Sequence, residues 1–404
     1  MSKNIEETDE KKVKKSYGVL KIIIAIILTA IITYFCTINF TLNSYLNGAD
    51  ITYLTTKLVL IKNKLEDTYI YDMDSEKMIE SSIKGYVNGL GDKYTEYLTK
   101  EDMKNLLETT SGSFVGIGVY MVNNTADNTI VIVGVIDGSV AQSAGLQVGD
   151  IISKVNDIEY KGEQLDKVSE SIKGEEGSEV KITVIRNSET LDFNIKRSSV
   201  KIKSVDSKML DDNIGYIQIA SFNDGTADEF KSAYNEIKDS VKKGLVIDLR
   251  NNGGGVVDES LKIAETMVEK GKTLLITADK NKNEKVDKSK ENPIINVPVI
   301  LLINNYTASA SEILAGTLKE NCGYKIVGIQ SYGKGVIQSI YSFKDGTGLK
   351  VTMEEYFTPN HNVINKVGIS PDIEVDLDDE WKNISNVPYE NDLQLQRAVE
   401  ELNK

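Results

Sequence analysis

From Ser199 onward, apolar segments of strand length alternate with amphipathic segments of helix length, and this alternation constrains the fold more than any other feature. The predicted strands include Ile214–Ala220, Leu245–Leu249 and Val297–Ile303. The predicted helices include Asp228–Val241 and Ser309–Lys319. Strands that alternate with helices predict an α/β (α+β) core, which we place at residues 199–380. A C-terminal helical segment is expected over residues 381–404.

Near the N-terminus, the run Ile22–Ile38 is apolar and carries no charge. Five lysines precede it, at positions 11, 12, 14, 15 and 21. About 20 apolar residues can span a bilayer, and a positively charged flank stays on the cytoplasmic side. We therefore predict a cytoplasmic tail over residues 1–18, a transmembrane signal-anchor over 19–42 and the rest of the chain outside the cell membrane. A cleaved signal peptide is the alternative.

Residues 43–112 are predicted to form a helical N-terminal region. Apolar residues recur at spacings of three and four between Leu54 and Leu65, as on one face of a helix. Asp74 and Thr99 are predicted helix starts. We expect this region to serve as a cap or a dimer arm and to carry no chemistry.

Residues 113–198 show short strands, a helix near Asp166–Lys173 and three small-residue motifs. The motifs are Gly116-Ile-Gly-Val119, Ala144-Gly-Leu146 and Gly149-Asp150. In this order they resemble a PDZ domain of the bacterial protease type. The backbone amides of Gly116, Ile117, Gly118 and Val119 would then bind the terminal carboxylate of a peptide, and the adjoining strand edge would pair with it. For the loop alone, glycines that only permit a tight turn are the alternative.

The composition excludes several kinds of site. The chain has one histidine, His361, and two cysteines, so it offers neither a multi-histidine zinc site nor a cysteine-rich metal site. Its net charge of −14 argues against binding nucleic acid. If the chain is a hydrolase, its base is therefore expected to be Lys, Asp or Glu.

Two segments contain groups that could stabilise negative charge. Leu245–Gly255 is a buried strand that ends in three glycines, whose backbone amides could approach an oxyanion. Asn304–Glu312 opens a helix, and the positive end of the helix dipole favours developing negative charge there. Thr307, Ser309 and Ser311 are the candidate nucleophiles; the alternative is that they only cap the helix.

A third segment, Ser331–Gln338, places Lys334 between two glycines beside an apolar strand. A lysine in an apolar pocket has its charged form disfavoured, so it could accept a proton from a serine. Lys334 and Gln338 are four residues apart, which would put them on one face of an extended strand. The alternative for Lys334 is a solvated surface lysine.

Taken together, these segments resemble the carboxy-terminal (tail-specific) processing serine proteases over about residues 50–400. The motifs are Gly215-Tyr-Ile217, Asp248–Gly255, Ser309-Ala-Ser-Glu-Ile313, Gly333-Lys-Gly335 and Pro371-Asp372. The resemblance implies a peptidase core of crotonase/Clp-like type with an inserted PDZ domain. It makes Ser309 the nucleophile, Lys334 the general base and Gln338 the residue that orients the lysine. Gly254 and Ala310 would form the oxyanion hole, Ser311 and Glu312 would support the site, and no metal or cofactor would be needed.

The resemblance also implies partners and points of difference. The substrates would be proteins or peptides with free C-termini, in envelope maintenance or sporulation signalling, and the terminal helices could form a homodimer. Lys173 stands where the family often has the arginine that links peptide binding to activation, and Gly253 replaces a usual proline. The competing hypotheses are an inactive PDZ scaffold that binds C-termini and, more distantly, a lipid- or retinoid-type binding module.

Overall fold

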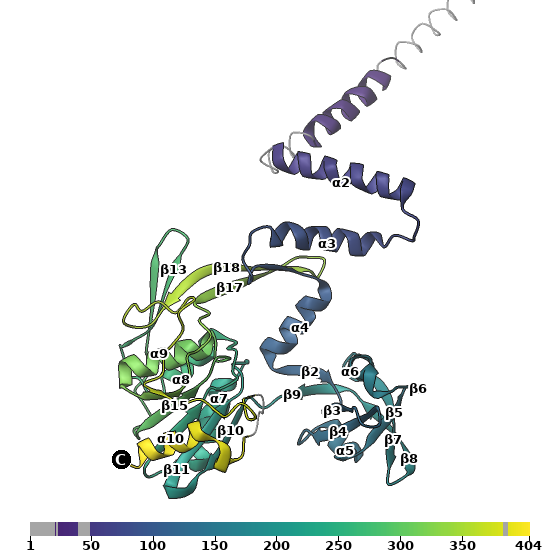
Figure 1. Cartoon of the computed structure of the whole chain (residues 1–404). Coiled ribbons are helices and arrows are strands. Elements are labelled where there is room, and N and C mark those ends of the chain that lie inside the picture. The colour runs from purple at the N-terminus through teal and green to yellow at the C-terminus, as the bar shows by residue number, and fades with distance from the viewer. Residues whose placement is uncertain (1–20, 22, 39–48, 383–386) are drawn as a thin grey trace, which may run out of the picture. The chain divides into compact units, whose positions relative to one another are not determined.

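The computed structural model describes residues 21, 23–38, 49–382 and 387–404. The chain forms two compact units, residues 1–79 and 80–404 (Figure 1). In the first unit, residues 23–38 are helical, with exposed apolar side chains such as Ile26, and α2 (Ala49–Thr68) follows. Within the described residues, no helix has both the length and the apolar character that crossing a membrane requires. The rest of the predicted anchor (19, 20, 22 and 39–42) and the predicted tail (1–18) lie outside the described residues.

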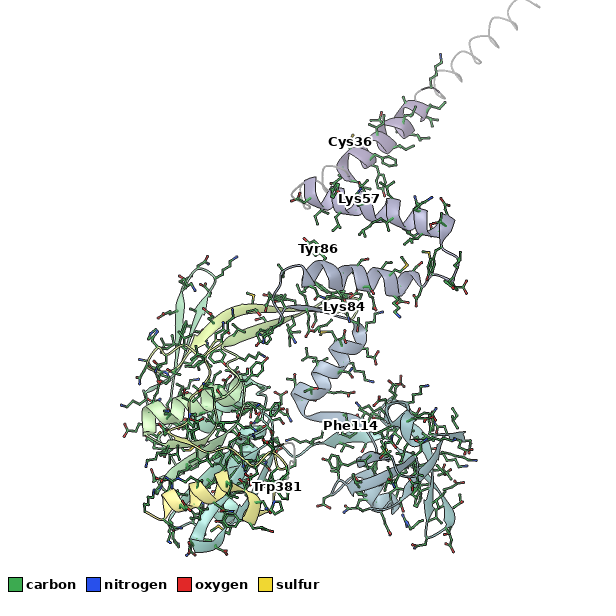
Figure 2. All side chains as sticks on the ribbon, in the orientation of Figure 1. Cys36, Lys57, Lys84, Tyr86, Phe114 and Trp381 are labelled. Atoms are coloured by element: carbon green, nitrogen blue, oxygen red, sulfur yellow. The ribbon has the colours of Figure 1, made fainter. Side chains whose placement is uncertain are left out.

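The two predicted helix starts are confirmed. The Asp74 carboxylate accepts the Lys77 amide at 3.0 Å where α3 (Ser75–Asn88) begins. Thr99 and Asp102 form a reciprocal capping box at the start of α4 (Lys100–Ser111), with N···O distances of 3.0 and 3.1 Å. The Asp102 carboxylate also lies 2.9 Å from the ammonium group of Lys84, labelled in Figure 2.

The segment resembling a PDZ domain forms a small β-domain with a core of its own. Its strands are β2 (Ser113–Gly116), β3 (Val119–Asn124), β4 (Thr129–Val135), β5 (Ile151–Val155), β6 (Ile158–Glu159), β7 (Glu179–Arg186), β8 (Glu189–Lys196) and β9 (Ser198–Lys201). Its helices are α5 (Val140–Ala144), the 3₁₀ turn η1 (Gly162–Gln164) and α6 (Leu165–Ile172). The main sheet has the order β3-β4-β5-β7-β8, with β6 beside β5, while β2 and β9 pair separately. The core contains Ile117, Ile132, Val168 and Ile182.

The predicted α/β core contains a six-stranded sheet in the order β10-β11-β12-β15-β16-β19, parallel from β11 onward. Its strands are β10 (Val205–Met209), β11 (Ile214–Ile219), β12 (Gly244–Asp248), β15 (Val299–Ile303), β16 (Lys325–Gly328) and β19 (Ile373–Glu374). The helices are α7 (Thr226–Ile237), α8 (Val257–Ala264), α9 (Ala310–Cys322) and α10 (Leu393–Leu402), and the 3₁₀ turns are η2 (Asp211–Asn213) and η3 (Tyr389–Asn391).

Both faces of this sheet are covered, because successive strand residues point to opposite sides. Leu245 and Ile247 of β12 pack in the cluster that contains residues of α7, α8 and α9. Val246 between them packs with Leu395 and Ala398 of α10. The C-terminal helix therefore folds back onto the sheet.

A second, antiparallel sheet has the order β1-β18-β13-β14, with β17 also beside β18. Its strands are β1 (Glu96–Leu98), β13 (Thr273–Asp279), β14 (Glu284–Lys288), β17 (Val336–Ser342) and β18 (Gly348–Phe357). Asp279–Asn292 is rich in Lys, Asn and Glu, a composition that predicts a solvated loop. This prediction is wrong, because β14 pairs with β13 there as an exposed hairpin strand. Strand β1 precedes the PDZ segment in the chain and pairs with β18 of the core. The PDZ segment is therefore an insertion within the core.

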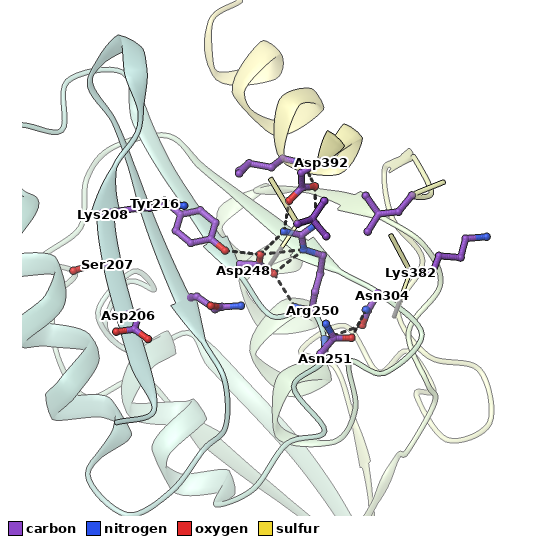
Figure 3. A pocket seen from close by; sticks show the side chains of 14 residues that line it. Asp206, Ser207, Lys208, Tyr216, Asp248, Arg250, Asn251, Asn304, Lys382 and Asp392 are labelled. Atoms are coloured by element: carbon purple, nitrogen blue, oxygen red, sulfur yellow. Dashed lines mark hydrogen bonds and ion pairs between the residues drawn. The ribbon is translucent and has the colours of Figure 1, made fainter. Parts of the chain in front are cut away.

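A buried charge cluster ties α10 to the end of β12 (Figure 3). The Arg250 guanidinium bonds Asp248 at 2.6 Å and both carboxylate oxygens of Asp392 at 2.8 Å. Burial opposes the charge of Arg250, but the two carboxylates hold its pKa above the ordinary value. Tyr216 donates to Asp248 at 2.7 Å, and Asp392 also caps α10 through the Leu395 amide. The cluster lines a cavity of about 350 Å³.

We expect Asp392→Ala to lower the free energy of unfolding by about 3–5 kcal/mol, because it removes a partner of a buried cation and the cap of α10. The free energy of unfolding is measured by urea denaturation, with the fluorescence of Trp381, the single tryptophan, as the signal. Glu400→Ala removes an exposed partner of Arg397 in the same helix and should change stability by less than about 0.5 kcal/mol. Equal losses in the two variants would contradict the prediction.

Candidate active site

Ser309 lies in a sharp turn between β15 and α9. Its backbone has φ 58° and ψ −118°, a positive φ that residues other than glycine rarely adopt. Such strain costs about 1–3 kcal/mol and persists only where surrounding contacts hold it. A strained strand-to-helix turn is also the setting of nucleophilic serines in other hydrolases. The turn thus puts the Ser309 hydroxyl at the amino end of α9, where only 7% of the residue is exposed.

Asn252 joins the glycine-rich turn after β12 to this serine turn. Its backbone carbonyl accepts the Ala308 amide at 3.1 Å and the Ser311 hydroxyl at 2.9 Å. Its side chain donates to the Ile219 carbonyl at 2.8 Å and accepts the Gly254 amide at 2.9 Å. Asn252 is fully buried, and sequence reasoning missed it because an asparagine in a polar turn looks like any turn residue.

Gly254 lies directly against the serine turn. Its φ is 103°, and a Cβ atom there would stand 2.8 Å from both the Ala308 carbonyl oxygen and the Ser309 Cβ, so only glycine fits. Its amide, a predicted oxyanion-hole donor, is engaged by Asn252 in this conformation. The other predicted donor is the amide of Ala310, the first residue of α9, which has no acceptor within its helix.

The buried carboxylate of Glu312 holds the serine turn and the lysine loop together. One oxygen accepts the amides of Ser309 at 2.8 Å and Lys334 at 2.9 Å. The other accepts the Ser331 hydroxyl at 2.5 Å and the Gly333 amide at 2.7 Å. The backbones of the predicted nucleophile and base therefore meet at a single oxygen atom. Glu312 thus occupies the supporting position that the resemblance implied.

Lys334 is half-buried, and its ammonium nitrogen lies 5.1 Å from the centre of the Tyr94 ring. Burial lowers the pKa of Lys334, and the charge of Lys350 lowers it further, while Tyr332 and Glu312 act in the opposite direction. A lysine with a lowered pKa has a larger neutral fraction near neutral pH. That fraction is what a general base requires.

Tyr356 of β18 packs in the core cluster that contains residues of α9, and it reaches the lysine loop. Its hydroxyl donates to the backbone carbonyl of Lys334. Burial raises the pKa of Tyr356 well above its ordinary value, and the charge of Glu312 adds to this. The sequence offers no signal for this contact, because the run Leu349–Tyr356 predicts only a strand.

Gln338 does not have the strand relation to Lys334 that its spacing predicted. Strand β17 begins at Val336, after Lys334, so the two residues do not lie on one strand and the four-residue spacing does not set their relative directions. The Gln338 amide instead lies 3.4 Å from the Val336 carbonyl and from the Thr352 hydroxyl.

The segment before α4 reaches the site, a position that our expectation of a cap or dimer arm did not include. Lys93 donates to the Tyr332 hydroxyl at 2.9 Å and lies over the rings of Tyr94 and Tyr332, 4.8 and 4.9 Å from their centres. Tyr94 is also the ring that Lys334 faces. The three residues of β1 bring this segment to the core, and a strand that short has no clear sequence pattern.

In the PDZ segment, β3 has only β4 beside it in the sheet, so its other edge is open to an added strand. The loop Gly116–Val119 leads into β3. The side chain of Ile117 is fully buried in the PDZ core, and the carbonyls of Ile117 and Gly118 accept the amides of Ala141 and Ile136 at 2.9 and 3.0 Å. Any contact of this loop with a ligand would therefore come from its backbone.

Lys173 directly follows α6. Its ammonium group lies 2.9 Å from the carboxylate of Glu108 on α4 and 5.7 Å from the centre of the Phe114 ring, which Figure 2 labels. The lysine that replaces the family's usual arginine is therefore paired with an acidic side chain outside the PDZ segment.

Comparison with known proteins identifies both parts of the second unit. Residues 213–375 match peptidase family S41, and residues 131–186 match the PDZ domain. A probable CtpA-like serine protease of Staphylococcus aureus (strain N315) is 37% identical over 348 residues, which are 85% of this chain and 69% of the relative. The equivalent protein of Staphylococcus haemolyticus is 36% identical over 326 residues, 80% of this chain and 65% of the relative.

Solved structures show similar folds. A protein of Bacteroides fragilis described as an S41 protease superposes with a TM-score of 0.53 at 17% identity, over 83% of this chain and 92% of that one. The photosystem II D1 C-terminal processing protease is 30% identical over 81% of this chain and 89% of its own, with a TM-score of 0.49. The chain belongs to peptidase family S41, the C-terminal processing serine peptidases, and carries a PDZ domain.

Proposed function

We propose that this peptidase is a membrane-anchored endopeptidase in which Ser309 is the nucleophile and Lys334 the general base. The observation that carries the proposal is the shared oxygen of Glu312, which accepts the backbone amides of both residues. The strained backbone of Ser309 and the lowered pKa of Lys334 support the same two roles.

In the proposed reaction, neutral Lys334 takes the hydroxyl proton of Ser309 while the serine oxygen attacks the peptide carbonyl. The amide of Ala310 stabilises the tetrahedral oxyanion. The Gly254 amide can join it only after leaving its bond to Asn252. Lys334 then protonates the leaving amine, and water hydrolyses the acyl-enzyme. Gln338 would orient the lysine after its side chain turns from Thr352.

For substrate capture, we propose that the PDZ domain binds free C-terminal tails of proteins or peptides. The open edge of β3 would pair with the tail, and the backbone of Gly116–Val119 would hold its carboxylate. If tail binding moves α6, the ion pair between Lys173 and Glu108 must change. Through that change, Lys173 would link tail binding to activation of the peptidase.

The location and assembly of the protein are further proposals. The exposed apolar side chains of residues 23–38 and the lysines before them support a signal-anchor with the catalytic part outside the cell membrane. We also propose a homodimer that forms through the terminal helices. For the core, we propose a crotonase/Clp-like type, because helices cover both faces of the parallel sheet. The pathway proposed is envelope maintenance or sporulation signalling.

We expect Ser309→Ala and Lys334→Ala each to lower kcat/KM at least about 1,000-fold, because each removes a reacting group. The assay incubates the protein with an unfolded substrate that has a free apolar tail and identifies the products by mass spectrometry. Ser339→Ala and Lys344→Ala, at exposed positions, serve as controls and should retain activity. Tail binding without cleavage by the parent chain would favour the inactive scaffold, and full activity of Lys334→Ala would refute its role as base.

The charge of Lys350 lowers the pKa of Lys334, so Lys350→Met should raise that pKa. Because the base works only when neutral, the acid limb of the kcat/KM profile should move to higher pH. Lys350→Arg keeps the charge and should leave the limb in place. A limb that moves to lower pH in Lys350→Met, or does not move, would contradict the prediction.

If the Gly116–Val119 loop binds a terminal carboxylate, a substrate amidated at its C-terminus should be cut at least about 10-fold more slowly, because the charged hydrogen bonds are lost. Paired peptides that differ only in the terminal group, compared at concentrations below KM, measure this ratio. Equal cutting of the two would remove carboxylate capture from the proposal.

A further inference from the structure

The backbone of Lys334 is fixed on both sides, whereas its side chain has a single contact at its end. The Lys334 amide donates to Glu312 at 2.9 Å, and the Lys334 carbonyl accepts the Tyr356 hydroxyl. Within the part of the chain that the structure describes, the side-chain nitrogen makes no hydrogen bond or ion pair and lies over the Tyr94 ring, 5.1 Å from its centre. Because a lysine side chain has many rotamers, a fixed backbone does not by itself fix the nitrogen.

The Tyr94 ring is held in place by the turn that carries it. The Asp92 carboxylate accepts the Tyr94 amide at 3.0 Å and the Thr95 hydroxyl at 2.6 Å. The oxygen of the buried Thr95 hydroxyl accepts the amide of Thr352 on β18 at 3.0 Å. Strand β1, which follows this turn, pairs with β18 as well. The ring is therefore attached to the strand whose Tyr356 bonds the lysine loop.

An aromatic face suits a lysine that must gain and lose a proton. The ring attracts the ammonium form within about 6 Å, and its carbon surface packs against the apolar stem in either form. A carboxylate in the same place would hold the ammonium form more strongly and raise the pKa of the base. Lys93 also lies over this ring, but its ammonium group donates to the Tyr332 hydroxyl at 2.9 Å.

We propose that Tyr94 is a positioning residue, whose ring confines the Lys334 side chain to the orientation from which its nitrogen takes the Ser309 proton. This inference rests on the proposed Ser-Lys mechanism. Tyr94 exchanges no proton: the serine proton passes to Lys334 and then to the leaving amine. A segment that precedes the PDZ domain in the chain thereby takes part in the reaction.

The test compares the full-length parent chain with Tyr94→Leu, which removes the ring, and with Tyr94→Phe, which keeps the ring and removes only the hydroxyl. A fluorophosphonate probe measures the reactivity of Ser309 without tail binding: the serine oxygen bonds to phosphorus, fluoride leaves and the proton passes to the base. We expect Tyr94→Leu to lower the labelling rate, and kcat on a peptide with a free apolar C-terminus, about 10–30-fold, with KM changed less than about 3-fold.

Two controls separate positioning from general destabilisation. Tyr94→Phe should stay within about 3-fold of the parent, because phenylalanine presents the same aromatic face. Tyr97→Leu makes the same substitution in β1, where the side chain lines a cavity beside Lys84 and Asp102, and should also stay within about 3-fold. The melting temperature of each variant, and its binding of the peptide, show that it is folded.

Unchanged or faster labelling of Tyr94→Leu would overturn the inference, as would an equal loss in Tyr94→Phe or in Tyr97→Leu. These outcomes leave the Ser-Lys proposal intact, provided that the parent is labelled and that Ser309→Ala and Lys334→Ala are not. A parent chain that is not labelled, or a Lys334→Ala variant that is labelled like the parent, would overturn the proposed mechanism and this inference with it.

Discussion

The candidate site depends above all on the buried carboxylate of Glu312. Removing a carboxylate from water costs several kcal/mol unless hydrogen-bond donors replace the water. Four donors do so, and they come from the serine turn, from Ser331 and from the loop that holds Lys334. If the serine turn or the lysine loop shifted alone, part of the buried Glu312 carboxylate would lose its hydrogen-bond donors. The strained backbone of Ser309 is held against relaxation in this way.

The sheet topology explains why these segments meet. In a parallel sheet the carboxyl ends of neighbouring strands lie at the same edge, so the turns after β12 and β15 are adjacent. Asn252 joins those two turns and sets Gly254 against Ser309. The antiparallel sheet supplies the other side of the site. Tyr356 is on its strand β18, and Tyr94 lies just before its strand β1.

Much of the fold was predictable because it follows from local patterns. The strand and helix alternation, the helix start at Thr99 and the C-terminal helix were predicted and are confirmed. The hairpin strand Glu284–Lys288 was missed because its surface is polar and its partner strand decides its conformation. The expected strand relation of Gln338 to Lys334 was wrong because Lys334 lies in the loop that Glu312 holds, before β17 begins at Val336.

By itself, the sequence determined the class of protein and the residue types available for chemistry. One histidine and two cysteines excluded the usual metal sites, and the ordered motifs led to the family and to Ser309, Lys334 and Gly254. Only the tertiary structure decided that Glu312 binds the lysine loop as well as the serine turn, and that Tyr356 bonds the same loop. These two bonds of Lys334 each join residues 22 positions apart along the chain. No local pattern of residues encodes such a distance.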